Sequence, residues 1–266
     1  MNHSLLPVGM KQNAQPKADD RRVLTAPDAA ATEVARSLLA RFVASDTSFR
    51  PDGVSDWTVS VDTIRFLAAH TPAVGSTLET GAGLSTVLFA ALGGRHICVC
   101  PDRGEADRIL AYCEAEGIAT SGLKFLIARS EDALPALDAP LLDLVLIDGG
   151  HGFPMPMIDW YYTASKLKLG GILVIDDTNL WPCALLVNFL KHDSAWTSVG
   201  RIGRRTFAFR KVAPFEYKEF CFQPYVLRKS RFRSLAARAL VAWDLLVAGD
   251  AAGFFRRCRK AVKEAR

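Results

Sequence analysis

Short apolar segments that resemble strands alternate with helical segments along the middle of the chain, and this alternation limits the possible folds more than any other feature. The expected strands cover residues 75–78, 96–100, 123–128, 144–147 and 172–175. Strands that alternate with helices form a parallel sheet covered on both faces, and wholly apolar strands are buried on both sides. We therefore predict an α/β fold with a doubly wound, Rossmann-like sheet.

The segments that flank these strands complete the expected organisation. Helices are expected at 28–45, 60–70, 86–92, 105–117, 157–167 and 182–192, and a hairpin at 196–211 turns at Gly203. Asp28 is expected to cap the first helix, residues 49–57 form a loop, and Gly170 and Gly171 are expected to cap the helix before them. The predicted division is a disordered leader plus an N-terminal helix at 1–55, a ligand-binding domain at 56–212 and a basic helical extension at 213–266.

Acidic side chains follow several of the expected strands. Right-handed crossovers bring the carboxyl ends of parallel strands to one edge, and ligands bind at that edge where the strand order reverses. The acids expected there are Glu79, Asp102, Asp148, Asp176 and Asp177.

A glycine turn, Glu79-Thr-Gly81-Ala-Gly83-Leu-Ser85-Thr86, connects the first strand to a helix. Gly81 and Gly83 allow the backbone to turn sharply and approach a ligand. A dinucleotide turn has a third glycine where this chain has Thr86. Glu79 would repel a pyrophosphate but suits a cationic ligand, so the turn favours S-adenosylmethionine (SAM) over NAD. The alternative is a tight turn with Glu79 as an exposed acid.

Three motifs together resemble a known family. The glycine turn, Ile147-Asp-Gly-Gly-His151 and Gly170-Gly-Ile-Leu-Val-Ile-Asp-Asp177 resemble the class I SAM-dependent methyltransferases, and look closest to the small-molecule O-methyltransferase branch. The resemblance covers about residues 57–211. It implies a seven-stranded methyltransferase sheet whose seventh strand is antiparallel, with N-terminal helices and a C-terminal helical tail. It also implies that SAM is held by Glu79, Gly81, Gly83, Ser85 and Thr86.

The resemblance also implies contacts to the rest of the cofactor. The family has a ribose-binding acid at the end of the second strand, where this chain has Cys100, so Asp102 or Glu105 would take its place. Near the adenine amine, Glu131 and Asp132 are the candidates. Each of these acids could instead be an ordinary solvated loop residue.

Asp148, Asp176 and Asp177 end two expected strands that, as neighbours, would lie about 4.8 Å apart. Three crowded carboxylates would raise one another's pKa, and a divalent cation would relieve this. Oxygen ligands select a hard ion such as Mg²⁺, which would bind a substrate hydroxyl and lower its pKa. The alternative is that these aspartates cap the segments that follow.

His151 lies between two glycines, which leave its imidazole free to reach the ligand edge. A histidine can accept a proton from a hydroxyl near neutral pH, so His151, beside Asp148, is the predicted catalytic base. The alternative is that it only hydrogen-bonds the loop or the acids. The next helix begins with Asp159, Trp160, Tyr161 and Tyr162, which are candidates for the wall of an acceptor pocket, although aromatic residues there are more often in the core.

Charge is distributed unevenly along the chain. From residue 213 onward there are 12 Lys and Arg against five Asp and Glu, whereas the rest is slightly acidic. No nucleic-acid groove is therefore expected across the domain. The tail predicts either a helical pair packed on the domain or on a second copy, or a basic surface that contacts anionic lipid or a partner.

The remaining features predict a cytoplasmic protein. No run of 18 apolar residues is present, so no transmembrane segment is expected, and the start lacks the apolar stretch of a secretory signal. The six cysteines have no zinc spacing and are expected to be reduced core residues; they are Cys98, Cys100, Cys113, Cys183, Cys221 and Cys258.

These observations predict a SAM-dependent methyltransferase that methylates a hydroxyl of a small molecule or sugar, with or without Mg²⁺. Two alternatives stay open. One is an NAD-dependent oxidoreductase, and the other is a non-catalytic, methyltransferase-like binding module that docks through its basic tail.

Overall fold

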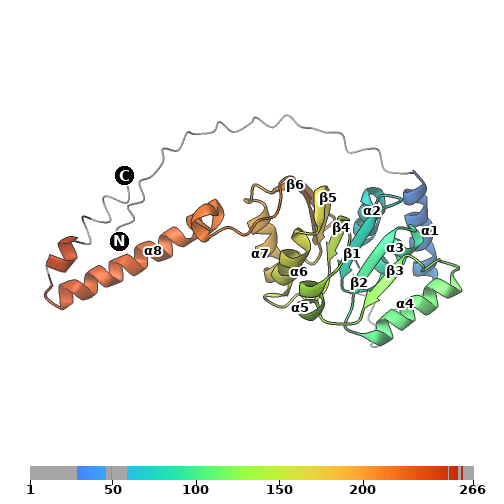
Figure 1. Ribbon diagram of the computed structural model, residues 1–266, viewed down its shortest axis with the longest axis horizontal. Coiled ribbons are helices and arrows are strands. Elements are labelled where there is room, and N and C mark those ends of the chain that lie inside the picture. Colours follow the sequence, from blue (N-terminus) through green and yellow to red (C-terminus); the bar gives the residue numbers. More distant parts are fainter. Residues whose placement is uncertain (1–28, 46–48, 50–58, 251, 257–258, 260–266) are drawn as a thin grey trace, which may run out of the picture.

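The computed structural model describes residues 29–45, 49, 59–250, 252–256 and 259, and its centre is one seven-stranded sheet. The strand order is β3-β2-β1-β4-β5-β7-β6 (Figure 1). The strands are β1 (Ser76–Thr80), β2 (Arg95–Val99), β3 (Leu123–Leu126), β4 (Leu142–Ile147), β5 (Leu167–Ile175), β6 (Trp196–Ile202) and β7 (Thr206–Lys211). The first five pair in parallel, and β7 is antiparallel to both β5 and β6. The predicted fold class, including the antiparallel strand, is confirmed.

Helices cover both faces of the sheet (Figure 1). One face carries α1 (Ala29–Ser45), α2 (Val61–His70), α3 (Leu84–Ala91) and α4 (Arg103–Ala115). The other carries α5 (Ser130–Ala133), η2 (Leu134–Ala136), α6 (Met155–Ala164) and α7 (Trp181–Leu190). Successive β4 residues alternate between the two cores: Leu144 and Leu146 join the first, and Val145 and Ile147 the second. This alternation explains why the strand is apolar throughout.

The first helix belongs to the domain. Ala35 and Leu38 of α1 are fully buried in the same core as Ile64 of α2 and Leu88 of α3. The predicted boundary at residue 56 is therefore wrong, because α1 covers apolar surface that the sheet and α3 would otherwise expose. The predicted leader at 1–28, the Asp28 cap and most of the loop at 49–57 lie outside the described residues.

The second helix begins as predicted. Ser60 Oγ accepts a hydrogen bond from the backbone N–H of Thr63 at 3.2 Å, which satisfies one of the unpaired donors at the start of α2. Thr63 Oγ1 in turn lies 2.7 Å from Thr206 Oγ1 of β7. The contact between Thr63 and Thr206 connects the start of α2 to the start of β7, at the edge of the sheet where the ligand is expected.

Gly170 and Gly171 do not cap a helix, contrary to expectation. They lie inside β5, where the pairing with β4 jumps from Leu142–Leu167 to Leu144–Ile172. Gly170 has φ of 82°, a conformation that glycine adopts without strain. The two glycines therefore form an irregularity in the strand, and the preceding helix ends at Ala164.

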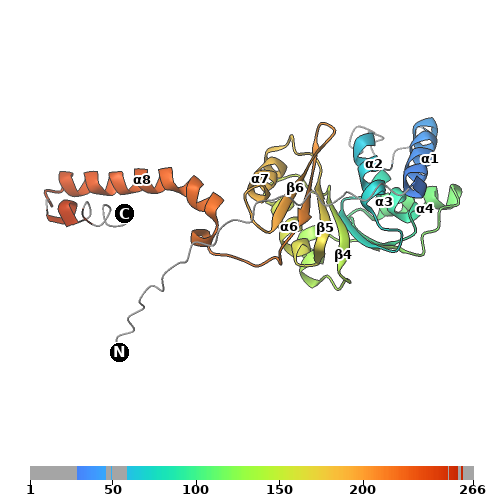
Figure 2. The same cartoon turned by 90° about the horizontal axis from the view of Figure 1, so that it is seen from above.

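The chain continues beyond the sheet into η3 (Phe220–Phe222), the long helix α8 (Pro224–Val247) and a short helical stretch at 252–256. A helical extension was predicted, but α8 extends away from the sheet (Figures 1 and 2). Among the described helices, none has the length and apolar character needed to cross a membrane.

The cysteines follow the prediction with one exception. Cys98, Cys100, Cys113 and Cys183 are buried and free, whereas Cys221 is exposed. Cys258 lies outside the described residues.

Candidate functional site

A cavity of about 500 Å³ lies at the carboxyl ends of β1, β2 and β4. Chain order reverses between β1 and β4, the position where ligands bind in open α/β sheets. The stretches that line the cavity are 81–85, 129–131 and 148–151, together with Val99, Pro101, Glu105 and Met155. The predicted donor turn and the predicted base therefore share one cavity.

The two glycines of the turn serve different purposes. Gly81 has φ of 86°, and a Cβ there would lie 2.2 Å from the backbone oxygen of Asp148. Gly81 therefore lets the ends of β1 and β4 approach each other. A Cβ on Gly83 would meet no protein atom within 4 Å, and Gly83 lines the cavity. Its missing side chain leaves that space to a ligand.

Glu79 and Thr86 lie beneath the turn and do not line the cavity. Glu79 is 1% exposed and Thr86 is fully buried. Thr86 Oγ1 donates a short hydrogen bond to Glu79 Oε1 and accepts one from the N–H of Gly83 at 3.0 Å. The expected direct role of Thr86 in holding the cofactor is therefore corrected to bracing the turn from below. Glu79 braces the turn in the same way, from beneath.

His96 is part of this buried arrangement, and the sequence analysis missed it. Its Nε2 lies 3.1 Å from Glu79 Oε1, its Nδ1 lies 2.8 Å from Thr77 Oγ1, and its ring stacks on Phe89 with centroids 4.3 Å apart. A polar residue inside a strand that was expected to be buried was the available signal, because buried polar groups need partners.

The acids expected at the ribose position separate into two roles. Asp102 Oδ1 accepts from the N–H of Gly104 at 2.8 Å, so Asp102 caps α4 and does not line the cavity. Glu105 does line it. Cys100 is buried beside Glu105, with Sγ 3.5 Å from Oε2, and burial raises the pKa of the thiol to about 12. The thiol is thus neutral, and Glu105 is the candidate acid that lines the cavity.

The two candidates near the adenine also separate. Glu131 lines the cavity, whereas Asp132 is exposed outside it. The pKa of Glu131 is lowered by hydrogen bonds from its own backbone N–H and from Arg129, whose Nε lies 2.5 Å from Oε1. Glu131 therefore presents an ionised carboxylate at this end of the cavity.

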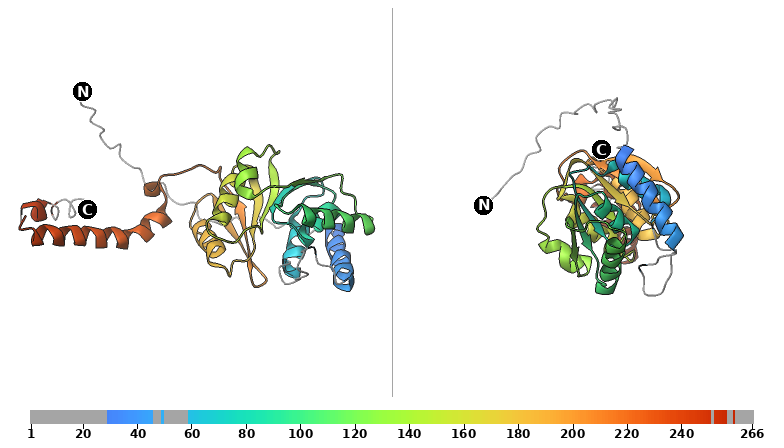
Figure 3. Two further views of the ribbon diagram at one scale, coloured as in Figure 1. Left: turned by 90° about the horizontal axis from the view of Figure 1, so that it is seen from below. Right: turned by 90° about the vertical axis from the view of Figure 1, so that its right-hand side faces the viewer.

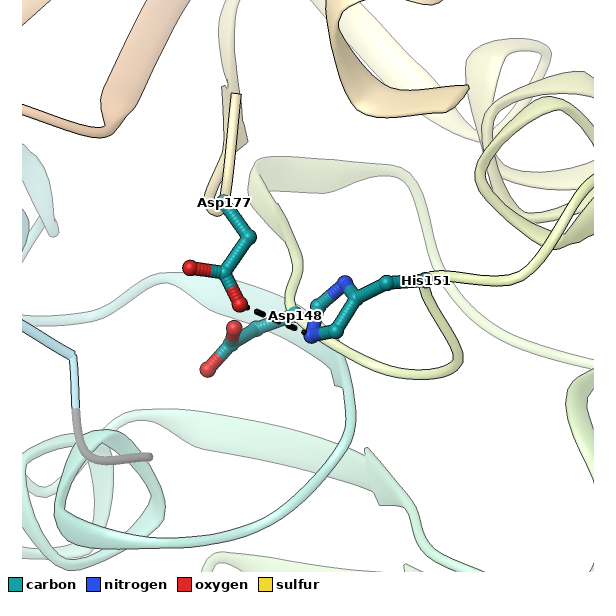
Figure 4. A group of neighbouring side chains, drawn as sticks. All are labelled: Asp148, His151 and Asp177. Carbon is teal, nitrogen blue, oxygen red and sulfur yellow. Dashed lines mark ion pairs between the residues drawn. The ribbon is translucent and has the colours of Figure 1, made fainter. Parts of the chain in front are cut away.

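Asp148, His151 and Asp177 come together beyond the ends of β4 and β5 (Figure 4), each offering a ligand atom within 4.8 Å of the others. His151 Nε2 lies 3.0 Å from Asp177 Oδ2. The hydrogen bond to His151 lowers the pKa of Asp177, with a further contribution from Arg205. Burial and the neighbouring Asp176 and Asp177 raise the pKa of Asp148 well above its ordinary value.

Asp176 does not join this group, which corrects the predicted set of three aspartates. It is fully buried, and its Oδ1 accepts a hydrogen bond from Thr206 Oγ1 of β7. Arg205, in the turn between β6 and β7, lies 3.6 Å from Asp176 Oδ2 and 3.3 Å from Asp177 Oδ1. Asp177 follows the end of β5 with φ of 50°, a left-handed conformation, and it is Asp177 that faces His151.

Asp159 is not in the cavity wall either. It is fully buried on α6, where its Oδ2 accepts from Thr80 Oγ1 at 2.7 Å. Burial raises the pKa of this carboxyl to about 6. Asp159 therefore connects α6 to the end of β1, below the turn.

Comparisons with known proteins agree with this geometry. Residues 78–178 match a family model described as a methyltransferase domain. A cofactor-bound structure of Rv0187 from MTB is 20% identical, with a TM-score of 0.54 over 67% of this chain and 91% of that one. The O-methyltransferase TomG from Streptomyces achromogenes, in complex with SAM, is 17% identical, with a TM-score of 0.50 over 71% and 92%.

A third structure, the SAH-bound methyltransferase PaMTH1 from Podospora anserina, is 14% identical, with a TM-score of 0.50 over 71% of this chain and 90% of that one. A comparison of the sequence with curated proteins finds no match. The family model thus describes residues 78–178 as a methyltransferase domain, and the solved structures share its fold.

Proposed function

We propose that the chain transfers the methyl group of SAM to a hydroxyl of a small molecule or sugar. The observation that carries the proposal is the shared cavity, since Gly81, Gly83 and Ser85 line it together with His151. A methyl acceptor bound beside the cofactor would therefore place its hydroxyl within reach of a proton acceptor. Such positioning converts an encounter of two reactants into a local step.

The residues present fit SAM, which supplies a methyl group on a sulfonium. Gly83 leaves the space in the cavity that a Cβ would fill, and the start of α3 offers backbone N–H groups beside it. Glu105 is placed to accept from ribose hydroxyls, and Glu131 from the adenine amine. Glu79 contributes negative charge beneath a cationic ligand without touching it.

His151 would act as the base. Asp177 accepts from Nε2, and its lowered pKa keeps it ionised, so we assign the Nε2–H tautomer to the imidazole. The lone pair on Nδ1 then meets the thiol of Cys183, whose Sγ lies 3.9 Å away. A thiol is a weak donor, so an acceptor hydroxyl would displace this contact and pass its proton to Nδ1, and the Asp177 carboxylate would stabilise the imidazolium that results. General base catalysis of this kind contributes about 10²- to 10⁴-fold to a rate.

Metal assistance is a second form of the proposal, favoured by the spacing in Figure 4. Asp148, His151 and Asp177 would hold a divalent cation, which would lower the pKa of an acceptor hydroxyl. An imidazole in the set favours Mn²⁺ or another transition metal over Mg²⁺. However, both oxygens of Asp177 already face cationic or donor groups, on His151 and Arg205. Methyl transfer that survives EDTA would exclude this form.

The test is SAM binding to the native protein and to Gly83→Val, measured by titration calorimetry. We expect the native protein to bind and Gly83→Val to lose at least tenfold in affinity with an unchanged unfolding temperature, because the added side chain enters only the cavity. Incubation with hydroxyl-bearing acceptors should then release the demethylated cofactor. Binding of NAD in place of SAM would support the oxidoreductase, and SAM binding without transfer to any acceptor would support the non-catalytic module.

A further inference from the structure

The start of α8 is attached to the domain, and the rest of the helix projects away from it. The Tyr225 ring stacks on His192, with centroids 4.5 Å apart, and meets the ring of Phe189 of α7 at 6.4 Å. Beyond this first turn, α8 extends away from the sheet in three views (Figures 1, 2 and 3). The attachment gives the projecting part a fixed origin on the domain.

Large apolar side chains are exposed on the projecting part. Leu240, Trp243 and Val247 are 64%, 66% and 73% exposed. Their spacing of three and four residues puts them on one face of the helix. The chain then turns at Gly249, and the following helical stretch exposes Phe255 to 62%. An apolar surface of this kind on a helix normally marks an interaction site.

Basic side chains flank the apolar part on both sides. Arg228, Lys229 and Arg231 are exposed before it, and Arg256 and Arg259 are exposed after it. Residues 228–266 contain eleven Lys and Arg against three Asp and Glu. Lys229 precedes Leu240 by 11 residues, about three helical turns, so it lies on the same face.

Exposed apolar side chains beside basic ones limit which partner can bind this part of the chain. A second copy of the chain would bring another strongly basic segment to the same place, and the like charges would repel. Nucleic acid would satisfy the charges but leave the apolar face in water. An anionic lipid surface satisfies both, because acyl chains accept the apolar side chains and the headgroups pair with Lys and Arg.

We propose that α8 and the helical stretch at 252–256 dock the protein on an anionic lipid bilayer. Leu240, Trp243, Val247 and Phe255 enter the boundary between headgroups and acyl chains. Lys229 meets the headgroups on the same face of α8, and the other basic side chains add attraction to the anionic surface. The segment lies on the surface and holds the methyltransferase domain beside the membrane.

The test is co-sedimentation of the full chain with vesicles of phosphatidylcholine, with or without 30% phosphatidylserine, at 0.15 M salt. We expect at least tenfold tighter binding to the anionic vesicles, because each basic residue near such a surface adds attraction. Raising the salt to 0.5 M should weaken this binding through screening.

Two variants separate the contributions. Leu240→Ser combined with Trp243→Ser should weaken vesicle binding at least tenfold. Arg228→Gln combined with Lys229→Gln and Arg231→Gln should reduce the preference for anionic lipid. As a matched control, Leu169→Ser removes an apolar side chain that is 62% exposed on the sheet domain and should leave vesicle binding unchanged.

Three results would overturn the proposal, provided that each protein keeps its native circular dichroism. The first is no vesicle binding by the native chain. The second is a concentration-dependent dimer, in place of vesicle binding, that Leu240→Ser with Trp243→Ser abolishes. The third is a preference for an oligonucleotide duplex over anionic vesicles. None of these outcomes depends on SAM binding or on activity.

Discussion

Two histidine–carboxylate pairs occur in this domain, and their surroundings differ. His96 and Glu79 are 3.1 Å apart, and each side chain is 1% exposed. His151 and Asp177 are 3.0 Å apart, and each side chain is 16% exposed and close to the cavity. The first pair is enclosed by Thr77, Thr86 and Phe89, whereas His151 of the second pair lines the cavity and has only the weak thiol contact of Cys183 at Nδ1. Similar chemistry thus stabilises the fold in one place and, in our proposal, serves proton transfer in the other.

The strongest test of this difference is His151→Asn. We expect kcat to fall about 10³-fold, because the variant removes the proton acceptor but leaves the cofactor end of the cavity intact. SAM affinity from titration calorimetry should change less than threefold. His96→Asn is the matched variant and should show the reverse, with lower stability but kcat within tenfold of native at a temperature where it remains folded. Equal losses of kcat in the two variants would remove the distinction.

The buried pair is tested by Glu79→Ala. Removing one member leaves His96 without its partner in a buried site, so the free energy of unfolding should fall by about 3 kcal/mol or more. Urea denaturation would measure the loss. Glu79→Gln keeps a hydrogen-bond acceptor and should lose less. A Glu79→Ala protein as stable as native would show that the pair does not brace the turn.

Asp159 is another buried acid, but its hydrogen-bond partner is a threonine, Thr80, where Glu79 and Asp177 each have a histidine. Its folded pKa of about 6 exceeds that of an ordinary carboxyl. The neutral form is therefore favoured on folding, and this contribution to stability is present below about pH 4 and lost as the pH rises through 6.

Asp159→Asn removes this ionisation. Relative to the native protein, its free energy of unfolding should rise by about 2 to 3 kcal/mol between pH 4 and pH 8. Urea denaturation at the two pH values provides the measurement. Parallel stability curves for the two proteins would contradict the prediction.

The smallest expected effect is that of Arg205→Ala. Arg205 is a quarter exposed, and its contact with Asp177 is 3.3 Å, so its loss should cost about 1 kcal/mol. The pKa of Asp177 should rise when this charge is removed, and kcat should fall less than tenfold. Arg205→Lys should retain most of the activity at neutral pH. A loss as large as that of His151→Asn would make Arg205 part of the reacting centre.

The fold was largely predictable, because buried parallel strands and the helices between them have distinct apolar patterns. The alternation identified the sheet, and Ser60 identified the start of α2. The wrong assignment of Gly170 and Gly171 has a physical cause, since glycine suits both a helix end and a strand irregularity. The choice depends on pairing with β4, which is a tertiary contact.

The site was predicted less completely. His151 and Asp148 lie at the carboxyl ends of the strands, as expected. The different positions of Asp176 and Asp177 depend on the backbone after β5, where Asp177 has φ of 50°, and no sequence pattern predicted this conformation. His96 requires the strand register, which places Thr77 opposite it and Glu79 opposite Cys98. The helix cap at Asp102 and the burial of Thr86 depend likewise on contacts that no local pattern contains.

The close approach of Gly81 to Asp148 has a consequence for how this domain can vary. The N–H of Asp148 donates to the oxygen of Thr80 at 3.1 Å, and the oxygen of Asp148 occupies the space where a side chain at position 81 would be. A larger residue at 81 would displace the strand end that carries Asp148. A change at position 81 would therefore alter the glycine turn and the Asp148 end of β4 together, so two stretches of the cavity wall cannot vary independently.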